Sequence, residues 1–537
     1  MLYRGRWIES RLGLTRSAGV WLDYWLFLHN DEAHSIWCAR PFGVQRLAIA
    51  ALDTNSKTDR VMRQQLAREA LAVARLSPFS VVVAPEPSGE PLQSQTWAPT
   101  WLKWFERLAK SANPLVIANE LTVPLAEALS HADWWMATFL TRRLAAELAD
   151  EEWSRRVLFQ TARSVILARS ELQSATLNRD ALIDVLRSVF TAPMARHYEV
   201  TVPITTVMIG KEVARRVQSM LKVEFVAGAA WHGLDVIAIR VFVQAVHIEE
   251  ATARALDRVR EALERLRTFH YIRAHLLDSA SVRAGDETDT TIVRMPQPFW
   301  TKASTVIRPV PTLPRGFDVA TARLPETQSR RWTAARWHLS QSLADWSEDA
   351  HSAASHAWQA LESFSGGPEG GWRQVLSLIP EYLEHLPVDL ATYLGRSLTI
   401  QRQSLHWSGY KCNWLPWASG KASVEVWVNR VLSSDQYRAW RPTPPEILFD
   451  SRVGLLRLVN ESIQSRKVVP WMYDRMHNDF ALLYSLRNRV VHTGQRLFGR
   501  PAAAYLARTA IEVLLALMTS RTAHLSSQRG TIDSADS

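Results

Sequence analysis

Arginine, asparagine and histidine stand close together in a short segment near the end of the chain, and their side chains suit phosphate chemistry. The segment reads LRNRVVHT over residues 486–493 and is followed by Gly494. On a helix, Asn488 and His492 share a face and Arg487 lies one step round. Arginine offers a planar fork of donors to phosphate oxygens, and histidine titrates nearest neutrality. The segment could therefore bind a phosphate and move a proton, the two tasks of metal-free RNA cleavage.

The spacing of arginine and histidine is weak evidence alone, because the same spacing occurs four times in the chain. The pairs with four to six residues between them are Arg240/His247, Arg265/His270, Arg331/His338 and Arg487/His492. Only the last pair has an amide directly after the arginine and a helix stop directly after the histidine. Cations in the last turn of a helix, followed by glycine, are also ordinary helix termination. Taken without further context, these residues favour a structural role over catalysis.

The elements that must position this segment are helices. Apolar periodicity predicts helices over residues 352–364, 372–386, 471–491 and 501–518, with a kink or break at Pro380 in the second. The first helix stops at Gly366-Gly367, and the last begins with a first-turn proline. Residues 328–525 are therefore expected to form a helical domain, and the small polar residues 526–537 a disordered tail.

This C-terminal region resembles the HEPN superfamily. The resemblance rests on the helix that ends in Gly-Gly, on YSLRN (484–488) leading into VHTG (491–494), and on one closing helix. The WQALE turn at 358–362 is most similar to the Apea-like branch. The resemblance covers about the last 200 residues. It implies a helical bundle that usually dimerises, with two copies of the arginine and histidine in one composite cleft.

The resemblance also implies roles for single residues. Many members are metal-independent endoribonucleases, often toxins or anti-phage effectors. If the catalytic roles of the family apply to this chain, Arg487 and His492 would be catalytic and Asn488 would support them. With the resemblance, catalysis is therefore favoured over a purely structural role for these residues. Some members bind nucleotides or act as scaffolds without cutting, so the fold does not guarantee activity. Glu362 could face Arg487, although a solvated glutamate is the more common case, and Tyr484 is expected to be a packing residue.

A second candidate surface lies between residues 391 and 424, which contain no aspartate or glutamate. Cations and aromatic side chains alternate there, as in single-stranded nucleic-acid binding. The candidates for RNA contact are Arg402, His406, Lys411, Trp414 and Lys421. Tryptophans that fill the core of the domain are a slightly more favoured interpretation of the same residues.

The composition fits a soluble globular protein with a polyanionic partner. The chain has 537 residues, 47% of them hydrophobic and 22% charged, so two to four domains are expected. A net charge of +10 favours nucleic acid first and a membrane surface second. Two cysteines exclude a disulfide framework and suit the cytosol. No stretch has a signal-peptide or transmembrane pattern, so a cytoplasmic location without membrane contact is expected.

The upstream sequence divides into three further parts. Residues 1–195 read as an α-rich or mixed domain, with short strands at 80–83 and 115–117 and helices at 59–76, 101–112, 125–148 and 179–190. Residues 196–276 read as a small α+β unit, with strands at 200–209, 223–227 and 235–246 backed by a helix at 249–269. Six prolines make residues 277–327 an expected extended connector. The predicted fold class is a mainly α multidomain protein, in which α+β regions precede a HEPN-like bundle.

The predicted function is a metal-independent endoribonuclease that uses the RNA 2′-hydroxyl and needs no cofactor. RNA would be its substrate, the C-terminal domain would form a homodimer, and a protein or nucleic-acid trigger would act on the N-terminal region. The resemblance implies a defence effector or toxin. Because a nuclease free to cut cellular RNA would harm its host, the upstream sequence is expected to regulate it, and the isolated 328–525 fragment is expected to be more toxic than the whole chain. Two alternatives stay open: a non-catalytic RNA- or nucleotide-binding module, and a protein-interaction scaffold that dimerises through the bundle.

Overall fold

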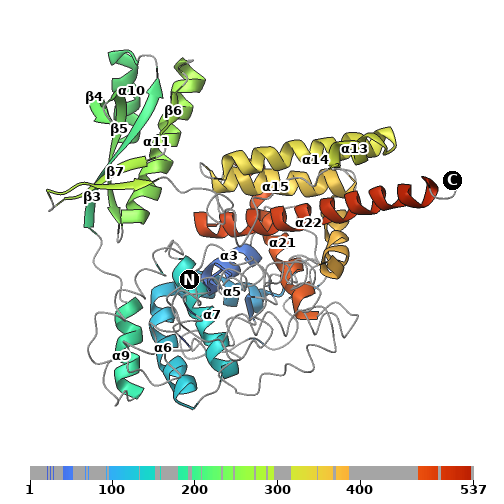
Figure 1. Ribbon diagram of the computed structural model, residues 1–537. Coiled ribbons are helices and arrows are strands. Elements are labelled where there is room, and N and C mark those ends of the chain that lie inside the picture. The colour runs from blue at the N-terminus through green and yellow to red at the C-terminus, as the bar shows by residue number, and fades with distance from the viewer. Residues whose placement is uncertain are drawn as a thin grey trace, which may run out of the picture. The chain divides into compact units, whose positions relative to one another are not determined.

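The computed structural model is mainly helical with a small antiparallel sheet, which confirms the coarse fold class (Figure 1). It describes residues 40–52, 92–93, 96–131, 134–150, 179–190, 196–206, 209–231, 234–245, 248–270, 272, 274–277, 279–285, 288–294, 316–346, 349–366, 371–385, 470–493 and 498–533. Eight single positions are described besides: Trp21, Trp25, Leu28, Ala67, Ala70, Leu71, Pro87 and Leu158.

The chain forms two compact units, one of which is discontinuous in sequence. The first unit comprises residues 1–190 and 298–537, and the second comprises residues 191–297. The N-terminal helices therefore share a unit with the C-terminal helices, whereas the sequence analysis treated residues 1–195 and 328–525 as separate domains.

The second unit is a split β-α-β arrangement. Its strands and helices are β3 (Arg196–Thr206), α10 (Lys211–Leu221), β4 (Val223–Trp231), β5 (Leu234–Ala245), α11 (Ile248–His270), β6 (Ala274–Leu276), β7 (Ser279–Ala284) and β8 (Thr291–Arg294). The sheet has the order β4-β5-β3-β7-β8 with antiparallel neighbours, and β6 pairs with β3. This is the strand order of ferredoxin-like folds, extended by the edge strand β8.

Alternating side chains build the core of this unit on one face of the sheet. Val200 on β3 and Val241 on β5 are fully buried and pack against Ala255, Val259 and Leu266 of α11. The prediction of a small sheet backed by a helix is thus confirmed. The unit extends beyond residue 276, because β7 and β8 form within the stretch expected to be a connector. The buried alternation of β7 was obscured in the sequence by the prolines that follow it.

The N-terminal part of the first unit is helical. Its described elements are α3 (Val44–Leu52), β1 (Leu92–Gln93), β2 (Thr96–Trp97), α5 (Pro99–Ser111), α6 (Pro114–Ser130), α7 (Trp134–Asp150) and α9 (Arg179–Phe190). The predicted helix at 101–112 and that at 179–190 are confirmed. The predicted strand at 80–83 lies outside the described residues, as does most of the predicted helix at 59–76.

Two predictions in this part were wrong. Residues 115–117 are not a strand but the first turn of α6. Asn113 caps this helix, since its side-chain oxygen accepts the N–H groups of Leu115 and Val116 at 3.0 and 3.2 Å. The single helix expected over 125–148 is two helices, because α6 ends at Ser130 and α7 begins at Trp134.

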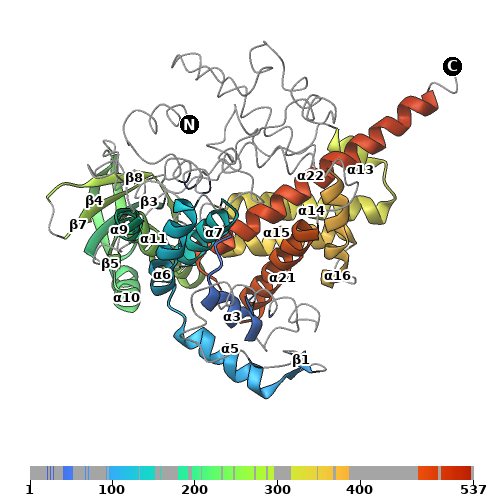
Figure 2. The same cartoon turned by 90° about the horizontal axis from the view of Figure 1, so that it is seen from below.

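The C-terminal part consists of long helices. They are α13 (Phe317–Ala322), α14 (Glu326–Asp345), α15 (Ala350–Ser365), α16 (Gly371–Leu376), α21 (Pro470–Thr493) and α22 (Arg500–Asp533). Helix α15 packs against α14, α21 and α22, which Figures 1 and 2 show from two sides. Its core residues Trp358 and Leu361 are fully buried. The described residues thus form a C-terminal helical region, as expected, although it belongs to the same unit as the N-terminal helices.

The break expected in the helix over 372–386 is present, but it lies at Ser377, three residues before Pro380, which is in the first turn of the following helical segment. Two further details of this part differ from expectation. Helix α13 lies inside the expected connector. Helix α22 continues to Asp533, so residues 526–533 are helical and not a disordered tail.

One described helix is long and apolar enough to cross a bilayer by composition. It is the stretch Arg500–Leu525 of α22, and most of it is buried inside the protein. Burial against α15 and α21 accounts for its apolar character, because the central helix of a bundle is apolar on every side.

Candidate functional site

Helix α21 carries the predicted catalytic segment at its C-terminal end. Its apolar face holds Phe480, Leu483 and Leu486, all buried, which fixes the rotation of the helix against its neighbours. Tyr484 packs on Trp358 of α15 with ring centroids 5.2 Å apart. This contact confirms Tyr484 as a packing residue and holds α15 beside the segment that follows it.

Arg487 is held by two neighbours. Its Nη1 group donates to Oδ1 of Asn488 at 3.0 Å, and its Nη2 atom lies 3.9 Å from Oε2 of Glu362 on α15. Asn488 is buried, whereas 23% of the Arg487 side chain is exposed. The buried Nε atom of Arg487 has no hydrogen-bond acceptor within the described part of the chain. The guanidinium is thus oriented by protein groups, and the exposed part of the side chain leaves donors for an incoming anion.

Glu362 orients Arg487 more than it neutralises it. A charge-assisted hydrogen bond from arginine to a carboxylate is typically 2.7–2.9 Å long, shorter than the 3.9 Å observed here. The Glu362 side chain is only 13% exposed, so it stays close to the guanidinium. The sequence suggested that these two residues could meet across the bundle, and the structure places them there. A phosphate would compete with a loosely held carboxylate, not with a tight bidentate pair.

The backbone of His492 lies in α21, one turn after Asn488, so the two residues share a helix face. The side chain of His492 lies outside what the structure describes, as does Gly494. The candidate RNA contacts Arg402, His406, Lys411, Trp414 and Lys421 also fall outside the described residues. The structure therefore brings together Arg487, Asn488 and Glu362, and it does not test the other members of the predicted site.

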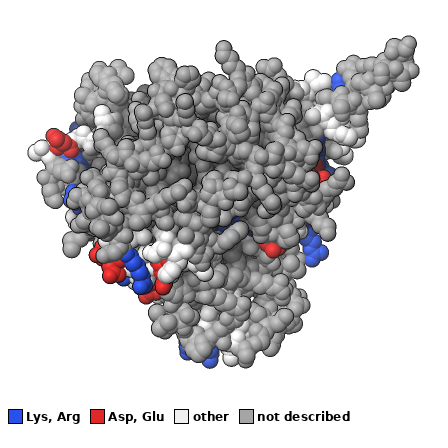
Figure 3. Space-filling model, turned by 60° about the horizontal axis from the view of Figure 1, so that its bottom comes forward, with Lys and Arg blue, Asp and Glu red and all other residues white. Residues whose placement is uncertain are grey.

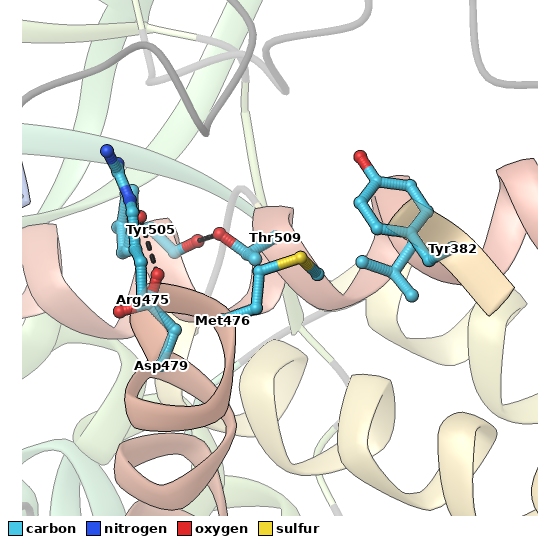
Figure 4. Close-up of a pocket in the computed structure, with 7 residues that line it drawn as sticks. Tyr382, Arg475, Met476, Asp479, Tyr505 and Thr509 are labelled. Carbon is cyan, nitrogen blue, oxygen red and sulfur yellow. Dashed lines mark hydrogen bonds between the residues drawn. The ribbon is translucent and has the colours of Figure 1, made fainter. Parts of the chain in front are cut away.

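A buried polar network that the sequence analysis missed lies further back on α21, and Figure 4 shows three of its members. The Tyr505 hydroxyl of α22 donates to Oδ2 of Asp479 at 2.7 Å and accepts from Nη2 of Arg475 at 3.0 Å. Nε of Arg40 donates to Oδ1 of Asp479 at 2.8 Å. The small pocket beside these groups has room for about one water molecule. It is a structural network and not a substrate cavity.

Burial decides the protonation of this network. Removal from water raises the pKa of Tyr505 to about 12, and the charge of Asp479 adds to the rise. Tyr505 is therefore a neutral phenol that can donate to a carboxylate. The arginine and aspartate at positions 475 and 479 stand one turn apart within an apolar helix, which is a sequence signal for a buried polar pair. Arg40 was beyond prediction, because it lies 439 residues from its partner.

A second cluster lies between α14 and α15 around Trp337, which is 55% exposed. The rings of His338 and His356 stack at 5.9 Å, and Trp337 meets them edge-on at 4.8 and 6.1 Å. His356 also lies 3.6 Å from Asp345. Burial, and then the charge of His356, lower the pKa of His338. No three His, Cys, Asp or Glu residues of the described stretches could together hold a metal ion.

No family model, curated protein or solved structure matches the chain. On the face seen in Figure 3, described Lys and Arg side chains lie beside Asp and Glu side chains at the lower left. Residues 191–297 contain 14 Lys and Arg against 13 Asp and Glu, so the excess positive charge of the chain lies in the first unit, which carries Arg487.

Proposed function

We propose that the chain is a metal-independent endoribonuclease of the HEPN type, with Arg487, Asn488 and His492 at its active site. The observation that carries this proposal is the Arg487 guanidinium, which Asn488 and Glu362 orient at the end of α21 while part of it stays exposed. An arginine whose orientation is fixed before binding stabilises developing negative charge without reorganisation cost. The basic excess in the same unit supports an anionic substrate.

The proposed reaction uses the nucleophile that RNA itself carries. The 2′-oxygen loses its proton to a general base and attacks the adjacent phosphorus, and the bond from phosphorus to the 5′-oxygen breaks. The leaving 5′-oxygen takes up a proton, so the products are a 2′,3′-cyclic phosphate and a 5′-hydroxyl. Arg487 would stabilise the charge on the phosphoryl oxygens, and His492 would transfer protons. DNA lacks the 2′-hydroxyl and would not be cut.

A homodimer through the C-terminal helices would supply two histidines to one phosphate. One imidazole could then act as base and the other as acid, which a single His492 cannot do in the same step. A regulated enzyme of this kind fits a cytoplasmic anti-phage effector or toxin that acts on RNA without a membrane or cofactor. These assignments belong to the proposal.

The alternative is a non-catalytic RNA- or nucleotide-binding module, or a dimerising scaffold. The contact between Glu362 and Arg487 supports the non-catalytic alternatives, because the carboxylate partly offsets the positive charge that would bind a phosphate. Replacement of His492 by alanine separates catalysis from binding. In a nuclease it should abolish RNA cleavage and leave RNA affinity unchanged, whereas a binding module has no cleavage to lose.

The test is incubation of the purified protein with total cellular RNA in EDTA, followed by analysis of fragment ends. The Arg487→Ala variant should cleave roughly 100- to 1,000-fold more slowly, the loss expected for one donor to a developing oxyanion. His492→Ala should lose a factor of roughly 100 to 10,000. Arg330→Ala is the matched control, because that arginine is exposed on α14 and pairs with Glu326 one turn away on the same helix.

Fragments that end in cyclic phosphate, present for the wild type and the control but absent for both active-site variants, are the expected result. Equal fragmentation by all four proteins would identify a contaminating nuclease. Intact RNA in every reaction, combined with no effect of wild-type expression on cell growth, would remove the proposal.

A further inference from the structure

The residues just before α3, together with its first residue Val44, form a short strap between the N-terminal helices and the pair α21–α22. We propose that this N-terminal strap, residues 40–44, positions the active-site end of α21, so that the upstream sequence supports cleavage and is not a detachable inhibitor. The inference rests on the proposed ribonuclease function for its activity readout. Its stability readout is independent of that function.

The first contact of the strap is ionic. Nε of Arg40 donates to Oδ1 of Asp479 at 2.8 Å, and its Nη2 atom lies 2.5 Å from the same oxygen. Only 2% of the Asp479 side chain is exposed, so this carboxylate depends on protein groups for its solvation. Tyr505 of α22 donates to the other carboxylate oxygen. Asp479 therefore joins three parts of the chain: the strap, α21 and α22.

The second contact is aromatic. The Phe42 ring is 2% exposed and meets Phe498 and Tyr505 edge-on, with centroids 5.6 and 5.8 Å apart. Such edge-to-face pairs are favourable beyond the area that they bury. Phe498 is the first described residue after α21 ends, so Phe42 fixes the point at which the chain turns into α22.

Helix α7 holds the strap from the other side. The Phe42 carbonyl accepts from Nη1 of Arg143 at 3.4 Å, and Oε1 of Glu147 accepts the Val44 N–H at 3.2 Å. Arg143 and Glu147 also pair with each other, and both are buried. The strap is thus bonded to the N-terminal helices through its backbone and to the C-terminal helices through its side chains.

These contacts lead to the candidate active site. Asp479 precedes Arg487 by eight residues, which is about 12 Å along the helix axis. The segment that joins α21 to α22 begins directly after Thr493, and at its far end Phe498 is held from two directions. Phe42 contacts its ring, and Nε2 of His351 bonds its carbonyl at 2.8 Å. His351 lies on α15, the helix that carries Glu362, so the strap and α15 together set the spacing between Arg487 and its partner.

The test compares the full-length protein with its Arg40→Ala variant, with Arg330→Ala as control. Cleavage by Arg40→Ala should fall by at least about tenfold in kcat, with KM changed little, because orientation is lost and not RNA affinity. A few millimolar guanidinium should restore both cleavage and the unfolding temperature of Arg40→Ala, because the ion can occupy the space beside Asp479. The same concentration of urea or sodium chloride should restore neither property. Guanidinium should change neither the cleavage rate nor the unfolding temperature of Arg330→Ala.

Two results would overturn the inference. One is an Arg40→Ala protein that cleaves faster than the wild type, which would make the strap an inhibitor. The other is the absence of any guanidinium-specific rise in its unfolding temperature. Should Arg40→Ala fail to fold, Phe42→Leu serves instead, with the same expected loss in kcat at unchanged KM. If the wild type cuts no RNA, the proposed function fails while the unfolding measurement still decides on the strap.

Discussion

Glu362 is the residue whose role the geometry predicts most sharply. It lies 3.9 Å from Arg487 with little exposure, and Glu362→Gln would remove the charge while keeping the shape. An ion pair of this length between partly exposed groups contributes up to about 1 kcal/mol, so cleavage should slow roughly fivefold. Single-turnover cleavage of a labelled RNA measures this loss.

Glu381→Gln is the matched control for that variant. Glu381 makes a bidentate pair with Arg521 at 2.8 and 2.6 Å, so the same substitution breaks a stronger ion pair within the same helical unit. It should leave the cleavage rate unchanged. Faster cleavage by Glu362→Gln would show instead that the carboxylate shields Arg487 from phosphate.

At the scale of elements, Tyr505 joins α21 to α22. Tyr505→Phe removes a donor from the buried Asp479 and an acceptor from Arg475, while the ring still packs on Phe42. Because one partner is charged and buried, the free energy of unfolding should fall by about 1.5–3 kcal/mol. Urea unfolding of the two proteins, followed by circular dichroism, measures this difference.

The pH dependence of that difference follows from the raised pKa of Tyr505. The folded protein keeps the phenol neutral up to about pH 12, whereas the unfolded chain ionises near 10.0. The contribution of the hydroxyl is therefore fully present below pH 10 and is lost between about pH 10 and 12. If the difference in unfolding free energy between the wild type and Tyr505→Phe varied between pH 6 and 9, the raised pKa of Tyr505 would not be its cause.

Local signals explain which elements the sequence could predict. Helix α15 was predictable because an apolar stripe ends at Gly366, whose φ of +153° suits glycine. The strand expected at 115–117 was an error, since three apolar residues fit either element and Asn113 with Pro114 marks a helix start. Arg487 and Asn488 were predictable as neighbours on one helix, and Glu362 only through the way in which α15 packs.

At the scale of the molecule, the sequence could not show that the first and last parts of the chain form one unit. Composition and prolines suggested boundaries near residues 195 and 328, because such signals report only on neighbouring residues. The contacts that join the parts are long-range: Arg40 with Asp479 and Phe42 with Phe498. A buried aromatic pair or ion pair of this kind leaves no periodic pattern in the sequence.

The unity of the first unit changes what is expected of the isolated 328–525 fragment. That fragment lacks Arg40 and Phe42. Loss of the partly exposed Arg40 leaves the buried carboxylate of Asp479 without one of its donors, which costs about 1–3 kcal/mol. Removal of a buried phenylalanine side chain costs a further 3–5 kcal/mol or so. Together these losses approach the whole stability of a typical domain, about 5–15 kcal/mol. The fragment should therefore be poorly folded and less toxic than the full chain. A fragment that folded and was released from inhibition would instead be more toxic than the full chain.

Growth of cells that express the fragment, the full chain or full-length Arg487→Ala to equal soluble levels distinguishes these outcomes. Circular dichroism and the oligomeric state of the purified fragment show whether it folds. A folded, dimeric fragment that arrests growth more strongly than the full chain would mean that residues 1–327 restrain the nuclease. A fragment that is helical and dimeric yet harmless would place the strap, through Asp479 and Phe498, among the requirements for an active Arg487.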